Sequence, residues 1–406
     1  MSASISCSDV LAAIRRGERL PPATIRDLGE NQPGDFFRII VEALADSFDP
    51  TQAQAYEDLM RVWIPPLPRV QPVIPDRVET VFVLSRVTLG ADIKITSIML
   101  DAMKRRFPDA EIVLVGNRKS AELFAADSRI SHLNADYPRT GSVTSRIQFA
   151  HELRRQIDGP NRLVVDPDSR MTQLGLIPVC APEHYLHFPS RTAFSLPLAD
   201  ATALLSRDCE GAVRSANLTE LAQAWLLETF GERGEAYIAT PRVPIEGDAP
   251  RATVSLGVGD NETKRVQGDF EALLIRALGE KFRTIWIDRG VGGNESARVT
   301  AAAEASGCID RIRFWEGSFA GFAALISQSD LYVGYDSAGQ HAAAATGTPL
   351  ITIFAGAPSD RFRQRWSPHG PGRIHIIEAD SLTPDACLQQ FRAAQDAVPS
   401  KTPGCK

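Results

Sequence analysis

The segment SDLYVGYDSAGQHAAAATGTPLITIFAGA, residues 329–357, alternates apolar runs with small and polar residues. It predicts a buried strand, an alanine-rich helix and a second buried strand, at residues 331–334, 341–346 and 350–354. Gly347 ends the helix, as glycine often does just past a helix C-terminus. The segment is therefore a βαβ unit. Its polar turn lies at the carboxyl end of the first strand, where open parallel sheets bind ligands.

The polar turn reads Asp336, Ser337, Ala338 and Gly339, and His341 follows on the first turn of the helix. A helix N-terminus has unpaired N–H groups and about half a positive charge, so it suits a phosphate. Small residues in the turn let a nucleotide approach the backbone closely. The simpler interpretation is that Asp336 or Ser337 only caps the helix. The turn alone leaves both interpretations open.

The composition excludes several classes of protein. The chain has 406 residues, enough for two or three domains, with 44% hydrophobic and 23% charged residues. Its net charge of −6 and pI near 5.7 argue against nucleic acid as the main partner. No run approaches the roughly 20 apolar residues of a transmembrane helix, and the N-terminus has no apolar core of a signal peptide. We therefore expect a cytoplasmic protein without a transmembrane segment.

Six cysteines are scattered along the chain, and none of them forms a CxxC motif. They are Cys7, Cys180, Cys209, Cys308, Cys387 and Cys405. This spacing indicates neither a zinc site nor a disulfide framework, and it fits a reducing compartment.

The chain divides into three predicted parts. Residues 1–75 contain segments of helical period and run into WIPPLPRVQPVIPDR, a stiff connector with five prolines. Residues 76–245 and 246–406 each alternate apolar strands with helices, which predicts two doubly wound parallel sheets. The proline-rich passage TPRVPIEGDAP spans the boundary between them. The expected fold class is α/β, with two Rossmann-like domains facing a cleft and a helical N-terminal extension.

Two loops of the first predicted domain carry polar side chains at strand ends. In RVTLGADIKIT, residues 86–96, Asp92 begins a helix, either as a cap or as a general base that takes a proton from an acceptor hydroxyl. DPDSR, residues 166–170, follows another strand. A D-x-D pattern can hold a metal on a sugar diphosphate, but Pro167 and the absence of other metal-type residues nearby favour a polar loop. Arg170 is a candidate contact for an acidic acceptor.

Two loops of the second predicted domain are rich in glycine. In GVGDNETKR, the backbone at Gly257 and the ammonium group of Lys264 suit a diphosphate. In DRGVGGNESAR, Glu295 either binds a ribose hydroxyl or only favours the helix N-terminus. Neither loop has the G-x-x-x-x-G-K-[ST] spacing of a P-loop, so a P-loop nucleotidase is not indicated.

Together these segments resemble glycosyltransferase family 9, the heptosyltransferases of lipopolysaccharide assembly and their relatives. The resemblance covers about residues 78–395 and is carried by VFVLSRVTLGADIKIT, continuing through LDAMKRRFPDAEIVLVG, and by LVVDPDSR, SLGVGDNETKR and DLYVGYDSAGQHAAAATGTPLITIFAGA. The last of these resembles the family's Asp-Ser/Thr-Gly-x-x-His-x-x-Ala-Ala signature and is the most specific.

The resemblance implies a GT-B fold and an inverting, metal-independent transfer of a sugar, with ADP-heptose as the expected donor and no further cofactor. It implies that Asp92 is the general base. We expect donor binding at Gly257, Lys264, Glu295, Asp336, Ser337, Ala338, Gly339 and His341, and acceptor binding at Arg86, Asp168 and Arg170. The expected partners are a nucleotide sugar and a glycan or other hydroxyl acceptor. We also consider peripheral membrane contact and a homo-oligomer built through the N-terminal extension.

Two departures from the family keep other functions open. The family's Gly-Asp pair is here Gly90-Ala91-Asp92, and Ala338 replaces the signature glycine. A nucleotide-sugar epimerase or hydrolase of GT-B fold is one alternative, and it would turn over the donor without a separate acceptor. A catalytically idle nucleotide-sugar-binding scaffold is another. An NAD-dependent dehydrogenase fits poorly, because the glycine fingerprint is not on the first strand.

Overall fold

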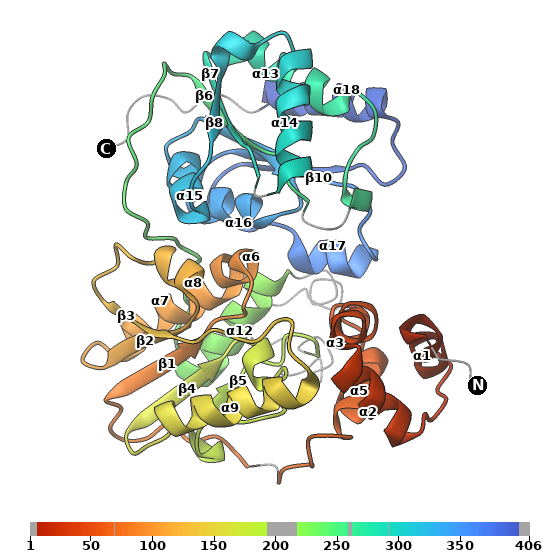
Figure 1. Ribbon diagram of the computed structural model, residues 1–406. Coiled ribbons are helices and arrows are strands. Elements are labelled where there is room, and N and C mark those ends of the chain that lie inside the picture. Colours follow the sequence, from red (N-terminus) through yellow and green to blue (C-terminus); the bar gives the residue numbers. More distant parts are fainter. Residues whose placement is uncertain (1–5, 69, 193–216, 259–261, 291, 398–406) are drawn as a thin grey trace, which may run out of the picture.

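The computed structural model describes residues 6–68, 70–192, 217–258, 262–290 and 292–397. It contains two sheets of parallel strands, each with helices on its faces, and a helical N-terminal extension beside the first sheet (Figure 1). The predicted fold class, two Rossmann-like domains with a helical extension, is confirmed. The predicted divisions at residues 75/76 and 245/246 remain predictions of the domain boundaries.

The first sheet has the strand order β3-β2-β1-β4-β5. Its strands are β1 (Thr80–Leu84), β2 (Glu111–Gly116), β3 (Ile130–Asn134), β4 (Arg162–Asp166) and β5 (Tyr185–His187). The central strand β1 pairs on both sides, with Val83 opposite Leu114 of β2 and Val165 of β4. These three side chains are fully buried, as expected for a parallel sheet covered on both faces.

The helices of this domain connect the parallel strands. They are α6 (Leu89–Ala91), η2 (Asp92–Thr96), α7 (Ser97–Arg106), α8 (Arg118–Glu122), α9 (Val143–Ile157) and α12 (Leu218–Phe230), with short 3-10 turns η3 (Arg170–Thr172) and η4 (Pro182–His184). Elements α6, η2 and α7 follow one another without a break, and η2 is a π-helical turn. Such turns occur frequently at functional sites.

The second sheet has the strand order β11-β10-β9-β6-β7-β8. Its strands are β6 (Arg251–Ser255), β7 (Thr284–Asp288), β8 (Ile312–Trp315), β9 (Leu331–Tyr335), β10 (Leu350–Phe354) and β11 (Ile374–Glu378). Its helices are α13 (Phe270–Lys281), α14 (Gly293–Ala305), α15 (Phe319–Ser327), α16 (Ala338–Ala345), α17 (Asp360–Trp366) and α18 (Pro384–Ala397), with 3-10 turns η6 (Glu262–Lys264) and η7 (Ile309–Arg311). The predicted βαβ unit is β9-α16-β10, and α16 begins three residues before the predicted helix.

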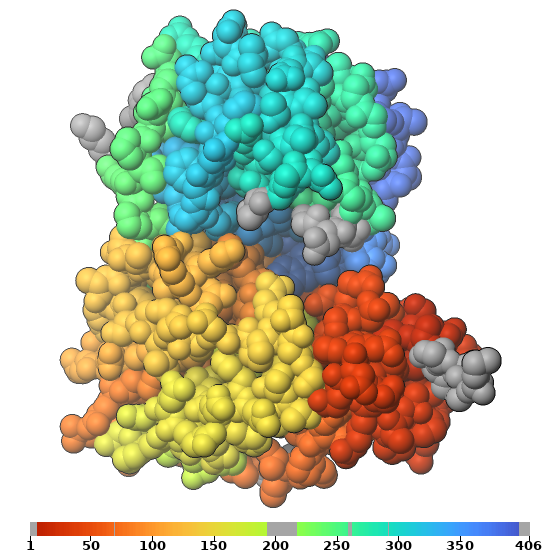
Figure 2. All heavy atoms as spheres, viewed as in Figure 1, coloured from red at the N-terminus to blue at the C-terminus, as the bar shows by residue number. Residues whose placement is uncertain are grey.

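The N-terminal extension packs against the side of the first domain (Figure 2). Its helices are α1 (Cys7–Arg15), α2 (Pro22–Asn31), α3 (Pro33–Asp35), η1 (Phe36–Val41), α4 (Glu42–Ala45) and α5 (Pro50–Met60). The Arg146 guanidinium of α9 lies 3.2 Å from the centre of the Phe37 ring, and the Tyr56 hydroxyl donates to the carbonyl of Gln173 at 3.1 Å. The apolar face of the extension is therefore covered by the chain itself.

None of the helices in the described residues is long and apolar enough to cross a membrane. Cys7, Cys180, Cys308 and Cys387 are free thiols. Cys209 and Cys405 lie outside the described residues.

Candidate functional site

The two domains meet where their strands end. The turn before Asp92 packs against the N-terminal end of α16 (Figure 1). A Cβ atom placed on Gly90 would lie 3.2 Å from the His341 ring and 3.4 Å from the Cα of Ala338. A side chain at Gly90 would push the domains apart, so this glycine permits their close approach. The fold thus brings Asp92, His341 and Ala338 to one interdomain region.

The predicted donor residues Lys264 and Asp336 form an ion pair with a distance of 2.9 Å between Nζ and Oδ2. The other carboxylate oxygen of Asp336 accepts from Nε2 of Gln340 at 2.6 Å, and Thr352 in turn donates to Gln340 at 2.8 Å. Both side chains of the ion pair are largely buried. The pair therefore fixes an ammonium group beside the N-terminus of α16.

The α16 N-terminus has no side-chain cap. Ser337 occupies the N-cap position, but its side chain accepts no hydrogen bond from the first turn. Asp336 is engaged with Lys264 and Gln340 instead. The interpretation that these two residues only cap the helix is therefore wrong, and the first-turn N–H groups of α16 are not satisfied by their side chains. Gly339 has a packing role, because a Cβ there would lie 2.1 Å from the Tyr332 hydroxyl.

Glu295 lies over two glycine loops of the second domain. A Cβ on Gly257 would come within 2.3 Å of its Oε1, and a Cβ on Gly290 within 2.5 Å of its carboxyl carbon. These loops follow the neighbouring strands β6 and β7. The structure thus places the carboxylate of Glu295 at the carboxyl edge of the sheet, where a ribose would approach. Residues 259–261 and 291 of the same predicted loops lie outside the described residues.

His341 is buried in the interdomain region, with 5% of its surface exposed. Burial holds its pKa well below the usual value for histidine, and Lys94 and Lys264 lower it further. The imidazole is therefore neutral at pH 7. It lies beside Trp366, with 6.1 Å between the ring centres.

Lys94 is an interdomain residue that the sequence did not single out. Its Nζ donates to the carbonyl of Ser367 at 2.6 Å, which links the first domain to the segment after α17. Burial lowers the pKa of Lys94 to about 7, although Glu220 and Asp336 act in the opposite direction. Half of these side chains are protonated near neutral pH, so this contact is sensitive to pH.

The wild-type protein should gain stability relative to a Lys94→Met variant as the pH rises from 7 to 9. The pKa of this lysine is about 7 in the fold, against 10.5 for a solvent-exposed lysine side chain. In that window the unfolded chain binds more protons than the folded one, so wild-type stability rises with pH. Each pH unit contributes about 1.4 kcal/mol, so unfolding of both proteins at the two pH values should show a relative gain of about 2–3 kcal/mol. If the difference in unfolding free energy between the two proteins is the same at pH 7 and pH 9, the lowered pKa of Lys94 is contradicted.

Asp92 is fully buried, and its two carboxylate oxygens accept four hydrogen bonds. The donors are Ser85 Oγ at 2.8 Å, Ser120 Oγ at 2.7 Å, Thr96 Oγ1 at 2.9 Å and the Arg86 backbone N–H at 2.8 Å. Burial raises the pKa of Asp92, and the hydrogen bonds offset this only in part. Three of the four donors are hydroxyl groups, which can rotate.

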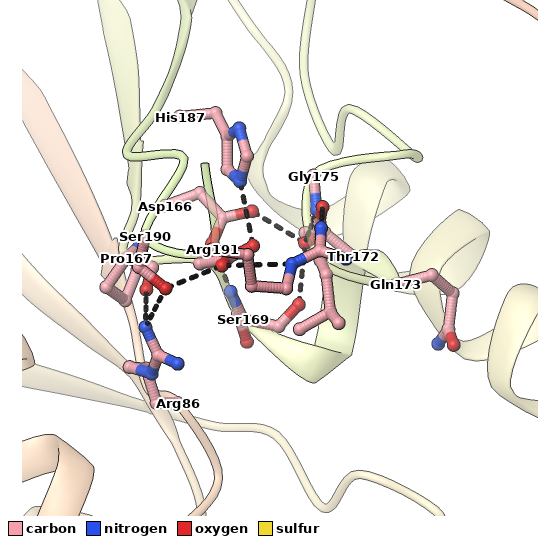
Figure 3. Close-up of polar contacts among 12 residues, drawn as sticks. Arg86, Asp166, Pro167, Ser169, Thr172, Gln173, Gly175, His187, Ser190 and Arg191 are labelled. Carbon is pink, nitrogen blue, oxygen red and sulfur yellow. Dashed lines mark hydrogen bonds and ion pairs between the residues drawn. The ribbon is translucent and has the colours of Figure 1, made fainter. Parts of the chain in front are cut away.

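The loop after β4 is held by buried carboxylates (Figure 3). Asp166 accepts from the Ser169 N–H and the Thr172 hydroxyl, each at 2.6 Å, and from Tyr185. The Ser169 hydroxyl donates to the carbonyl of Ser85 at 2.6 Å, which ties this loop to the end of β1. The D-x-D pattern thus anchors a polar loop.

Asp168 is also fully buried, and it accepts from Ser190 Oγ at 2.7 Å and Arg191 Nε at 3.3 Å. His187 Nε2 lies 3.1 Å from its other oxygen. Burial acts to raise its pKa, but Arg191, His187 and Arg86 outweigh burial and hold the pKa far below the usual value. Asp168 is therefore an ionised anchor for Ser190 and Arg191. Its carboxylate is occupied by these three contacts, and its predicted role in acceptor binding stays a prediction.

A cavity of about 90 Å³ lies where the extension and the two domains meet. We call it the junction pocket. Its polar and aromatic lining comes from Asp46 and Phe48 of the extension, Arg86, Arg170 and Arg191 of the first domain, and Trp366 of the second. Ala91, next to Asp92 in the chain, also lines it. The predicted acceptor residues Arg86 and Arg170 thus meet in one pocket. Asp46, Arg191 and Trp366 were not predicted.

In the part of the chain that the structure describes, no group of three or more His, Cys, Asp or Glu side chains is placed to hold a metal ion.

Residues 295–389 match the sequence model of glycosyltransferase family 9 (heptosyltransferase). Among solved structures, the chain resembles E. coli heptosyltransferase WaaC with ADP, at 15% identity and a TM-score of 0.54, over 78% of this chain and 99% of that one. It also resembles the family 9 glycosyltransferase from Veillonella parvula, at 14% identity and a TM-score of 0.53, over 80% and 91% of the two chains. No curated protein matches the sequence.

The chain thus has the GT-B fold of these solved structures, with two parallel-sheet domains that meet where their strands end. The family match covers α14 to α18, including the β9-α16 turn with its signature residues. The resemblance to glycosyltransferase family 9 is thereby confirmed.

Proposed function

We propose that the protein transfers a sugar from a nucleoside diphosphate sugar to an acceptor hydroxyl. The proposed donor is ADP-heptose, and the transferred sugar is heptose. One observation supports this above all: the uncapped N-terminus of α16 lies beside the Lys264–Asp336 ion pair. Helix N–H groups and an ammonium group together suit a diphosphate. In the reaction they would stabilise the negative charge that develops on the departing nucleoside diphosphate.

The remaining donor assignments follow from the same edge of the sheet. Glu295, lying over Gly257, is placed to accept hydrogen bonds from the ribose hydroxyls. His341 is neutral, so it can donate or accept a single hydrogen bond without repelling a cation. Ala338 faces Gly90 across the domain contact, so its methyl group narrows the space for the donor on that side.

Asp92 is the proposed general base. Its raised pKa suits a group that takes a proton near neutral pH. The acceptor oxygen would attack the anomeric carbon as the bond to the diphosphate breaks, and the hydroxyl proton would pass to the carboxylate. The attack comes from the face opposite the leaving group, so the configuration inverts. We propose that no metal ion takes part, because Lys264 and the α16 N–H groups supply positive charge at the diphosphate.

Incubation of the protein with ADP-heptose tests the proposal. ADP should be released faster when a hydroxyl acceptor is added, and a sugar–acceptor product should form with inverted configuration. UDP-glucose and GDP-mannose, which differ from ADP-heptose in both base and sugar, should react much more slowly. Fast turnover of the donor without any acceptor would instead favour the epimerase or hydrolase alternative, and tight binding without turnover would favour the scaffold.

A further inference from the structure

The junction pocket contains hydrogen-bond donors without acceptors. Nη1 of Arg191 and Nε1 of Trp366 are both buried, and neither has a hydrogen-bond partner. Both residues line the pocket. Buried polar groups are nearly always satisfied in folded proteins, so two such donors around one cavity indicate that a ligand oxygen belongs there.

The charges of the pocket favour an anion. Three guanidinium groups line it, from Arg86, Arg170 and Arg191, against two carboxylates, from Asp46 and Asp168. Asp168 is neutralised by its ion pair with Arg191, and Arg170 is balanced by Asp46 at 3.7 Å and Glu42 at 3.8 Å. The Nη1 group of Arg86 donates only to the carbonyl of Pro167 and the hydroxyl of Ser190 (Figure 3). Within the described residues, its charge therefore lacks a direct carboxylate partner.

The N-terminal extension forms the outer wall of this pocket. Phe48 packs against Phe362 of α17, with 6.5 Å between the ring centres, and its carbonyl accepts from Arg361 at 3.0 Å. The extension thus contacts the second domain as well as the first. At about 90 Å³ the pocket admits a group of only a few non-hydrogen atoms.

We propose that the junction pocket binds a compact anionic group of the acceptor, a carboxylate or a phosphate, and that the N-terminal extension is the wall that completes this subsite. The inference rests on the proposed function, because Ala91 places the pocket next to the proposed base Asp92. The anion would contact Arg86, Arg191 and Trp366. The acceptor is then a small, negatively charged hydroxyl compound or the charged end of a larger one.

The experiment is a calorimetric titration of acetate or inorganic phosphate into the full chain. The protein is first saturated with ADP, so that the donor site is already filled. One of them should bind with a millimolar dissociation constant, and the tighter one identifies the group. Trp366→Phe keeps the aromatic packing but removes the indole N–H, so it should weaken binding about tenfold. Asp46→Asn removes a negative charge from the pocket and should strengthen binding several-fold.

Several results would overturn the proposal: neither anion binds, both variants bind as the wild type does, or anion binding disappears once ADP is present. The last result would place the anion in the donor site. Both variants should retain the thermal stabilisation by ADP, which shows that they are folded. Failure of ADP to bind would count against the proposed function. The anion subsite is tested separately, by the change in anion affinity in Trp366→Phe and Asp46→Asn.

Discussion

An Asp92→Asn variant should transfer sugar about 10²–10⁴-fold more slowly than the wild type, while binding ADP with unchanged affinity. Asparagine has nearly the same shape as aspartate. The hydroxyls of Ser85, Thr96 and Ser120, which now donate to the carboxylate, can rotate to accept from the new amide. The fold should therefore survive, and only the ability to take a proton is lost. The measurement is the rate of ADP release from ADP-heptose with an added hydroxy acid as acceptor.

Asp127→Asn is the matched control, because Asp127 is another largely buried carboxylate of the first domain, and it contacts Lys104 and Tyr237 away from the junction pocket. It should keep most of the rate. The wild-type rate should also fall as the pH drops through the pKa of Asp92, which burial places above the usual aspartate value. Retention of the wild-type rate in Asp92→Asn would contradict the assignment of Asp92 as the general base.

A Lys264→Ala variant should bind ADP about 10–100-fold more weakly than the wild type. The substitution removes a charged hydrogen bond to the diphosphate, which typically contributes about 1.5–3 kcal/mol. It also leaves Asp336 without the ammonium group now 2.9 Å away, so an uncompensated carboxylate would face the diphosphate. Isothermal titration with ADP gives the affinity directly.

Two variants make this test specific. Lys281→Ala removes a lysine from the same domain that pairs with Asp396 at the surface, and it should bind ADP normally. Lys264→Arg keeps the positive charge and should retain part of the affinity. An Lys264→Ala variant that binds ADP as tightly as the wild type would contradict the placement of the donor diphosphate.

The sequence was most informative where strands are fully buried. The apolar run LITIF is β10 at the residues predicted, and the equally apolar runs EIVLVG and RLVVD form β2 and β4. By contrast, β3, β5, β8 and β11 were missed, and so was α17. All four of these strands lie at a sheet edge and mix polar with apolar residues, as ISHLN does in β3. Such short half-exposed strands lack a clear hydrophobic period, and pairing with a neighbour determines their structure.

The sequence indicated individual residues of the candidate site, but it did not indicate which of them contact one another. Lys264 and Asp336 were each expected at the donor, although nothing in the sequence indicates that they pair. The buried Lys94 lies two residues after Asp92, and its ordinary helical context gave no signal. Arg191 and Asp46 become site residues only because the extension packs against the loop after β4. Tertiary packing of distant segments creates that pocket, so no local pattern could reveal it.

Thermal melting with ADP, UDP, GDP, CDP and dTDP shows whether the protein binds a nucleotide sugar through its second domain. A nucleotide at 100 times its dissociation constant adds about 2.7 kcal/mol, which corresponds to a rise of roughly 5–10 °C for a domain of this size. ADP should produce such a rise in the wild type, and the rise should be lost in Lys264→Ala. No rise with any of the five nucleotides, or a rise that persists in Lys264→Ala, would contradict it.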